Sequence, residues 1–161
     1  MISKKYSDIM INVRKIVRAI NLESKSLEKN FGISIPQLLT LKHLNEQPDY
    51  KSTMRRLRDF LSLNASTVTG IVARLESKGY IARLPDPNDK RSTPIVLTSK
   101  GNELIKKTNE SLHERISKNL DRISDEEYLI IVQSFETITN FLNIEDIDAA
   151  PIITGPADIN Q

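Results

Sequence analysis

The chain contains no cysteine, so it can form no disulfide, no thiolate zinc site and no thiol-based redox switch. It also lacks any run of about 18 or more apolar residues, the length that a membrane-spanning helix needs. Its first residues show no apolar stretch ahead of a small-residue cleavage site, so we expect no signal peptide. Together these absences predict a cytoplasmic protein with no membrane association.

The sequence motifs of common enzyme sites are missing as well. The two histidines, His43 and His113, do not lie in a His-x-x-x-His or Glu-x-x-His spacing. No glycine-rich phosphate loop or nucleophile elbow is present. We therefore expect no catalytic residue, no metal site and no cofactor, and we expect both histidines to be solvent-facing or structural.

Basic residues are concentrated in the middle of the chain. The 161 residues carry a net charge of only +2, yet residues 51–91 hold nine basic and four acidic side chains. The rest of the chain is therefore slightly acidic. A basic segment in a near-neutral chain suits contact with phosphate, although a solvated surface gives the same asymmetry.

Apolar spacing and capping residues predict a mainly α-helical chain. The predicted helices span about residues 5–29, 35–46, 53–61, 64–78, 99–122 and 125–142. Residues 80–84 and 93–97 are predicted strands, because the eight residues between them include two prolines and suit a loop. Residues 143–161 are acidic and broken by proline and glycine, so we expect a loosely ordered tail.

This order of elements is that of a winged helix-turn-helix with a small β-hairpin wing. Such a fold places one helix in a DNA major groove and a basic loop beside it.

The helix at 64–78 would bury an apolar stripe formed by Val68, Ile71, Val72 and Leu75. Its other face carries small polar residues, a glycine and an arginine, which can approach base edges or phosphates. The predicted DNA contacts on this helix are Asn64, Ser66, Thr67, Thr69, Gly70 and Arg74. A plain amphipathic surface helix would show the same pattern.

The tip of the hairpin is the second predicted contact with DNA. Lys90 and Arg91 stand at the end of a proline-stiffened loop and suit a narrow minor groove, which attracts inserted basic side chains. Asp89 can hold the guanidinium of Arg91 through a charge-assisted hydrogen bond and fix its direction. A solvated hairpin turn is the alternative, since these are ordinary turn residues.

These motifs together resemble the MarR family of bacterial transcription regulators. In the wing, Asp89 and Arg91 match the family's aspartate and arginine two residues apart. The following strand ends in Leu97 and Thr98, and Gly101 comes three residues later. Upstream, residues 75–81 match the segment Leu-Glu-x-Lys-Gly-aromatic-Ile/Val at the end of the recognition helix. Gly70 departs from the pattern, because many relatives carry a bulkier or charged residue there.

The resemblance covers about residues 5–142 and implies a repressor that releases DNA when a small, often aromatic or anionic, ligand binds. No residue here identifies that ligand. A finer resemblance, carried by Arg14, residues 18–20, 24–25 and 32–38, is to the subgroup that regulates compatible-solute (ectoine-type) genes. The alternative is that this segment only meets the packing needs of the dimer helices.

We expect four parts in the chain. Residues 1–33 form an N-terminal dimerisation helix, 34–98 the DNA-binding domain, 99–142 the C-terminal dimerisation helices and 143–161 the tail. The outer helices carry apolar stripes that a domain of about 60 residues cannot cover alone, so they favour a two-fold interface. The expected function is sequence-specific binding of double-stranded DNA as a homodimer on a pseudo-palindrome. The alternatives are a winged-helix module that binds proteins and not DNA, and, less favoured, an enzyme.

Overall fold

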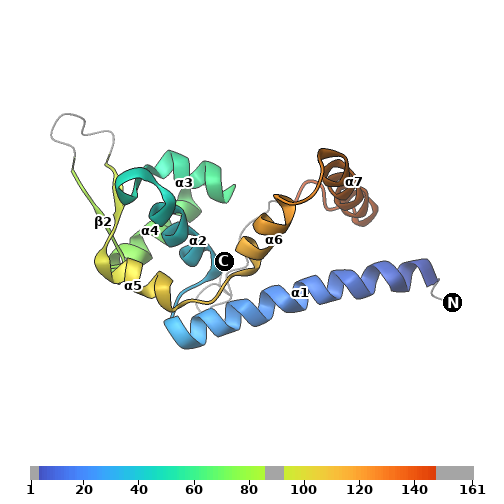
Figure 1. Cartoon of the computed structure of the whole chain (residues 1–161), viewed down its shortest axis with the longest axis horizontal. Coiled ribbons are helices and arrows are strands. Elements are labelled where there is room, and N and C mark those ends of the chain that lie inside the picture. Colours follow the sequence, from blue (N-terminus) through green and yellow to red (C-terminus); the bar gives the residue numbers. More distant parts are fainter. Residues whose placement is uncertain (1–3, 86–92, 148–161) are drawn as a thin grey trace. The chain divides into compact units, whose positions relative to one another are not determined.

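A computed structural model describes residues 4–85 and 93–147 of the chain. Contacts between Cα atoms divide it into two compact units, the first running through Thr108 and the second starting at Asn109. The first unit contains α1 (Lys4–Phe31), α2 (Ile35–Glu46), the short 3-10 helix η1 (Pro48–Tyr50), α3 (Met54–Leu61), α4 (Ala65–Ser77) and α5 (Ser99–Lys107). The second contains α6 (Leu112–Leu120) and α7 (Asp125–Leu142). Figure 1 labels most of these elements along the chain.

Side-chain caps explain where the helices of the first unit begin. Ser34, Thr53, Asn64 and Thr98 each accept a hydrogen bond from the backbone N–H three residues later. Each bond satisfies one of the amide groups that a helix start leaves without an intrahelical acceptor. At Ser34 the bond is reciprocal, because the Gln37 side chain accepts from the Ser34 backbone N–H. The predicted starts of these helices are therefore confirmed.

A small antiparallel sheet adjoins these helices. It contains β1 (Lys51–Ser52), β2 (Ile81–Arg83) and β3 (Ile95–Leu97) in the order β1-β3-β2. Ile81 pairs with Leu97 and Ser52 pairs with Ile95. The hairpin of β2 and β3 was predicted, whereas β1 was not, because two residues are too few to show the alternation of a strand. We call α2–α5 with the three strands the winged-helix domain.

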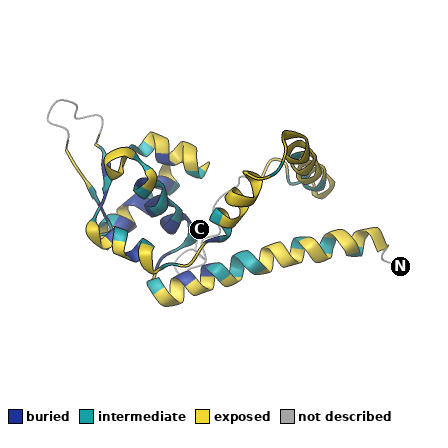
Figure 2. Cartoon of the chain, in the orientation of Figure 1, coloured by how far each residue is buried: buried dark blue, intermediate teal, exposed yellow. Residues whose placement is uncertain are grey.

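The winged-helix domain has one continuous hydrophobic core. Leu41, Leu44, Leu57 and Leu75 are fully buried in it, as is Ile95 from β3. In Figure 2 the buried positions gather on α2, α4 and the strands, while most of α1 is exposed. The buried residues of α1, Ser24 and Leu27, lie near its C-terminal end.

One prediction about the helices that follow the wing is wrong. Residues 99–122 were expected to form a single helix, but α5 ends at Lys107 and α6 begins at Leu112. The new helix starts at Ser111, whose hydroxyl accepts from the Glu114 N–H while the Glu114 carboxylate accepts from the Ser111 N–H. The apolar residues before and after this break keep helical spacing, so the sequence pattern gives no sign that the helix is interrupted. Consequently α5 contributes Leu104 to the core of the winged-helix domain.

The start and the end of α7 agree with the prediction from the sequence. Ser124 and Glu127 form the predicted capping box at the start of α7. Asn143, in the left-handed region, ends that helix, and residues 144–147 form turns. Of the predicted tail, residues 148–161 lie outside the described residues. None of the described helices is long and apolar enough to cross a bilayer.

Candidate nucleic-acid interface

Helices α3 and α4 form a helix-turn-helix with a tight turn. Ser62 ends α3 in the left-handed region at φ 54°, and Leu63 is buried beside it. Asn64 then caps α4, because its side-chain oxygen accepts from the Thr67 N–H at 2.9 Å. The turn thereby fixes the start of α4, the helix that carries most of the predicted contacts.

The two faces of α4 differ as the sequence predicted. Val68, Ile71, Val72 and Leu75 are its buried residues. On the other face, Asn64, Ser66, Thr69 and Arg74 are exposed, and Thr67 and Gly70 are partly exposed. A methyl group added at Gly70 would meet no heavy atom within 4 Å, so the glycine leaves open space rather than packing against the protein. The fold brings these six predicted residues onto one surface.

Two hydroxyl groups on this face already donate within the helix. Ser66 Oγ donates to the Asn64 side-chain oxygen and Thr69 Oγ1 donates to the Ala65 carbonyl, each at 2.8 Å. Their protons are engaged, so in this arrangement the remaining lone pairs can accept. In a major groove the matching donors are the amino groups of cytosine and adenine. The side-chain oxygen of Asn64 accepts the capping hydrogen bond, so the main role of Asn64 in this structure is to start α4.

The base of the wing is ordered by β2 and β3, and the Leu84 N–H donates to the Pro94 carbonyl at 2.9 Å where the strands separate. The predicted tip residues Asp89, Lys90 and Arg91 lie outside the described residues. The hairpin itself is therefore confirmed, and the direction of its tip stays a prediction.

Several basic residues contribute to this region without having been singled out from the sequence. Lys51 on β1 and Arg55 and Arg56 on α3 are exposed. In a helix-turn-helix the first helix crosses the DNA backbone, so these positions suit phosphate contact. The sequence indicated these residues only through the positive charge of residues 51–91. Net charge alone does not show which basic side chains contact DNA and which are only solvated.

His43 is a structural histidine of the winged-helix domain. Its Nε2 lies 3.3 Å from Ser52 Oγ, and its ring lies 4.3 Å from the Phe60 ring, centroid to centroid. Burial lowers the pKa of His43 below its ordinary value, with a smaller lowering from Arg56 that is opposed by Glu46. These contacts join α2 to β1 and α3, and they confirm that His43 is hydrogen-bonded and structural. Within the described ranges, no three histidine, aspartate or glutamate side chains gather as metal ligands.

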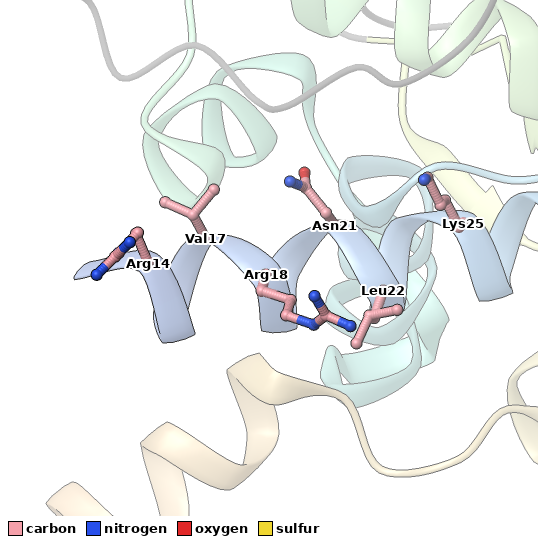
Figure 3. Close-up of a pocket in the computed structure, with 6 residues that line it drawn as sticks. All are labelled: Arg14, Val17, Arg18, Asn21, Leu22 and Lys25. Carbon is pink, nitrogen blue, oxygen red and sulfur yellow. The ribbon is translucent and has the colours of Figure 1, made fainter. Parts of the chain in front are cut away.

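A groove runs along α1, lined by Arg14, Val17, Arg18, Asn21, Leu22 and Lys25. Figure 3 shows Val17, Asn21 and Lys25 pointing to one side of the helix and Arg18 and Leu22 to the other. These are neighbouring rows of side chains four residues apart, with a furrow between them. Such furrows accept the side-chain ridge of another helix. The groove therefore suits helix packing better than enclosure of a small molecule.

Comparison with known proteins agrees with this geometry. The sequence profile of the MarR family matches residues 33–93 of this chain. The multiple antibiotic resistance protein MarR of Escherichia coli (strain K12) is 35% identical over 80 residues, which span 46% of this chain and 56% of that protein. The chain thus spans about half the length of this curated relative.

Solved structures extend the likeness along the chain. The MarR family transcriptional regulator Sco3205 of Streptomyces coelicolor, in complex with DNA, has a TM-score of 0.64 and 20% identity, with 92% of this chain and 94% of that chain covered. At that identity the match supports the fold. FabT of Streptococcus pneumoniae, in complex with DNA, has a TM-score of 0.55 and 27% identity, covering 86% of this chain and 97% of that chain.

The comparisons support the family and leave the compatible-solute subgroup a prediction. The family model covers most of the winged-helix domain, where the helix-turn-helix and the start of the wing lie. Sco3205 is described as a transcriptional regulator of the MarR family. The chain is therefore a member of the MarR family and a transcriptional regulator.

Proposed function

We propose that this regulator is a ligand-responsive repressor that binds double-stranded DNA as a homodimer on a pseudo-palindromic operator. The observation that carries the proposal is the division of α4 into a buried apolar stripe and an exposed face of small polar residues. An exposed helix face made mostly of small side chains can approach the floor of a major groove. The DNA-bound state of the Sco3205 and FabT structures supports the same use of this fold.

The homodimer is supported by apolar surface outside the winged-helix domain. Helices α6 and α7 contain no buried residue, and Leu129, Ile130 and Phe135 are each more than half exposed. Burial of such surface is favourable by about 25 cal/mol per Å². A two-fold partner would bury it, and a dimeric helix-turn-helix protein reads two half-sites about 34 Å apart, one turn of DNA. Residues 1–33 and 99–142 are therefore proposed to contain the dimerisation helices.

The proposed effector is a small molecule whose binding lowers the affinity for DNA. The family resemblance supports an aromatic or anionic compound. Coupling requires that the effector bind the DNA-free conformation more tightly than the DNA-bound one.

Binding to the DNA upstream of the protein's own gene tests the proposal. Fluorescence anisotropy should give tighter binding to that duplex than to a random duplex of equal length, in the same salt. Affinity for both should fall as salt rises, because bound lysine and arginine displace counterions. Equal binding to both duplexes would contradict sequence-specific recognition. Binding to neither at low salt would favour the alternative of a winged-helix module that recognises proteins.

A further inference from the structure

Two lysines tie the C-terminal end of α4 to neighbouring helices. The Lys78 ammonium group donates to the Gly32 carbonyl, just beyond the end of α1. Lys100, in the first turn of α5, donates from Nζ to the Lys78 carbonyl at 2.7 Å. The Lys100 ammonium also lies 5.1 Å from the centre of the Tyr80 ring. The contacts therefore run in series from α5 through α4 to α1.

Two glycines end the helices at these contacts. Gly32 and Gly79 have φ values of +64° and +73°, the left-handed region in which a glycine commonly ends a helix. A methyl group built at Gly32 would lie 4.0 Å from Lys78 Nζ, and one at Gly79 would lie 3.9 Å from Lys100 Cδ. Carbonyl groups at a helix C-terminus carry partial negative charge, which favours a nearby ammonium group. Lys78 thus lies beside the glycine that ends α1, and Lys100 beside the glycine that ends α4.

Two further polar contacts at this end of α4 join it to the wing and to the start of α5. Thr98 Oγ1 donates to the Gly79 carbonyl at 2.7 Å, and Arg83 on β2 lies 3.2 Å from the Glu76 carboxylate. Lys78 differs from them because it reaches the end of α1, 46 residues earlier in the chain. It is a direct polar link between the helix proposed to recognise DNA and a helix proposed to dimerise.

We propose that Lys78 is a positioning residue that sets the orientation of α4 relative to α1, with Lys100 holding Lys78 in place. The proposal rests on the proposed function, since orientation matters for DNA only if α4 reads it and α1 belongs to the dimer interface. In that case the Lys78 contact helps set the separation of the two recognition helices. Operators with one fixed half-site spacing would then bind best.

Two other roles for Lys78 predict different behaviour. A lysine that contacts phosphate would strengthen binding to every duplex, and its removal would lower the salt dependence by about one counterion. A solvated lysine would affect neither binding nor geometry. A positioning lysine affects geometry without DNA, and it affects operator binding more than binding to random DNA.

Distances between spin labels test the proposal without DNA. The chain has no cysteine, so Lys15→Cys on α1 and Ala73→Cys on α4 give two unique labelling sites, both exposed. Labelled chain diluted into excess unlabelled chain reports the distance within one protomer. We expect a narrow distribution for the parent and for Lys107→Met, which removes an exposed lysine at the end of α5. Lys78→Met should broaden it, and Lys78→Arg should largely restore it.

Binding to the upstream duplex gives the second readout. Lys78→Met should bind it roughly tenfold more weakly, the equivalent of removing one charge-assisted hydrogen bond, while random DNA and the salt slope stay unchanged. If Lys78→Met fails to fold by circular dichroism, Lys100→Met should broaden the distances in the same direction. An unchanged distribution in the folded variant overturns the proposal, as does equal weakening on both duplexes with a reduced salt slope. If the parent binds no DNA, the proposed function fails, and the distances still decide the role of Lys78.

Discussion

The winged-helix domain and the second unit use similar apolar sequences in different ways. In the winged-helix domain the apolar side chains of α2 and α4 are largely buried, with Leu41, Leu44 and Leu75 at 0% exposure. In α7 the apolar side chains of Tyr128, Leu129, Ile130 and Phe135 are about half exposed. Apolar surface that one protomer leaves uncovered has to be covered by another molecule or tolerated in water. The difference indicates a domain that is complete in one chain and helices that are not.

The largest expected effect lies in the winged-helix domain. Leu41→Ala should lower the free energy of unfolding by about 2–5 kcal/mol, because it leaves a cavity in a close-packed core. Chemical denaturation monitored by circular dichroism measures this. Leu129→Ala on α7 is the matched truncation at an exposed position, and below the dimer dissociation constant it should change stability by only about 0.5 kcal/mol. Equal destabilisation at low concentration would mean that α7 is already packed within one protomer.

The next effect concerns the second unit. Light scattering at micromolar concentration should give twice the 18.3 kDa chain mass. Phe135→Glu should shift the mass toward that of one chain, because it places a charge in an apolar contact. Gln133→Glu adds the same charge to the same helix at a polar position and should remain dimeric. A monomeric parent, or an unaffected Phe135→Glu variant, would contradict the assignment of α7 to the interface.

A third effect concerns the wing. Arg91→Ala should weaken operator binding by about 1–3 kcal/mol per half-site if the arginine contacts bases. It should also reduce the salt slope by about one for each phosphate charge that the arginine would have neutralised. Asp89→Ala should weaken binding less, because the carboxylate only orients the arginine. A purely electrostatic surface predicts the opposite sign for Asp89→Ala. Parent-like binding of Arg91→Ala across a salt titration would remove the wing from the interface.

The smallest effect is a pH dependence from His43. Its pKa in the folded protein is lowered by burial, so below its ordinary value of 6.5 the unfolded chain binds a proton that the folded chain resists. The free energy of unfolding should therefore fall as pH falls from 6.5 through the lower folded pKa, and then level off for this group. Replacement by glutamine should flatten this part of the profile, as measured by denaturation at several pH values. An unchanged slope in His43→Gln would assign the dependence to other groups.

Local signals in the sequence predicted most of the winged-helix domain. The cap at Asn64 and the stripe of Val68, Ile71, Val72 and Leu75 depend on residues within a few positions of one another, so spacing alone reveals them. The break after Lys107 was missed because the apolar spacing continues across it. The Lys78 contact with Gly32 was beyond prediction, since it joins residues that only the folded chain brings together.

In the candidate DNA interface, too, local spacing predicted some features and the folded structure was needed for others. The exposed face of α4 followed directly from helical periodicity once its buried stripe was identified. The hydrogen bonds that engage the Ser66 and Thr69 protons depend on side-chain rotamers, which spacing does not determine. The exposure of Arg55 and Arg56 on α3 likewise required the packing of that helix against its neighbours.

The most direct measurement of the central claim is the ratio of dissociation constants for upstream and random duplexes at one salt concentration. It should be made for the parent and for the combined variant Ser66→Ala, Thr67→Ala, Thr69→Ala. If the exposed face of α4 reads bases, the variant should keep its affinity for random DNA and lose most of its preference for the upstream duplex. An undiminished preference, or an equal weakening on both duplexes, would contradict sequence recognition by this face.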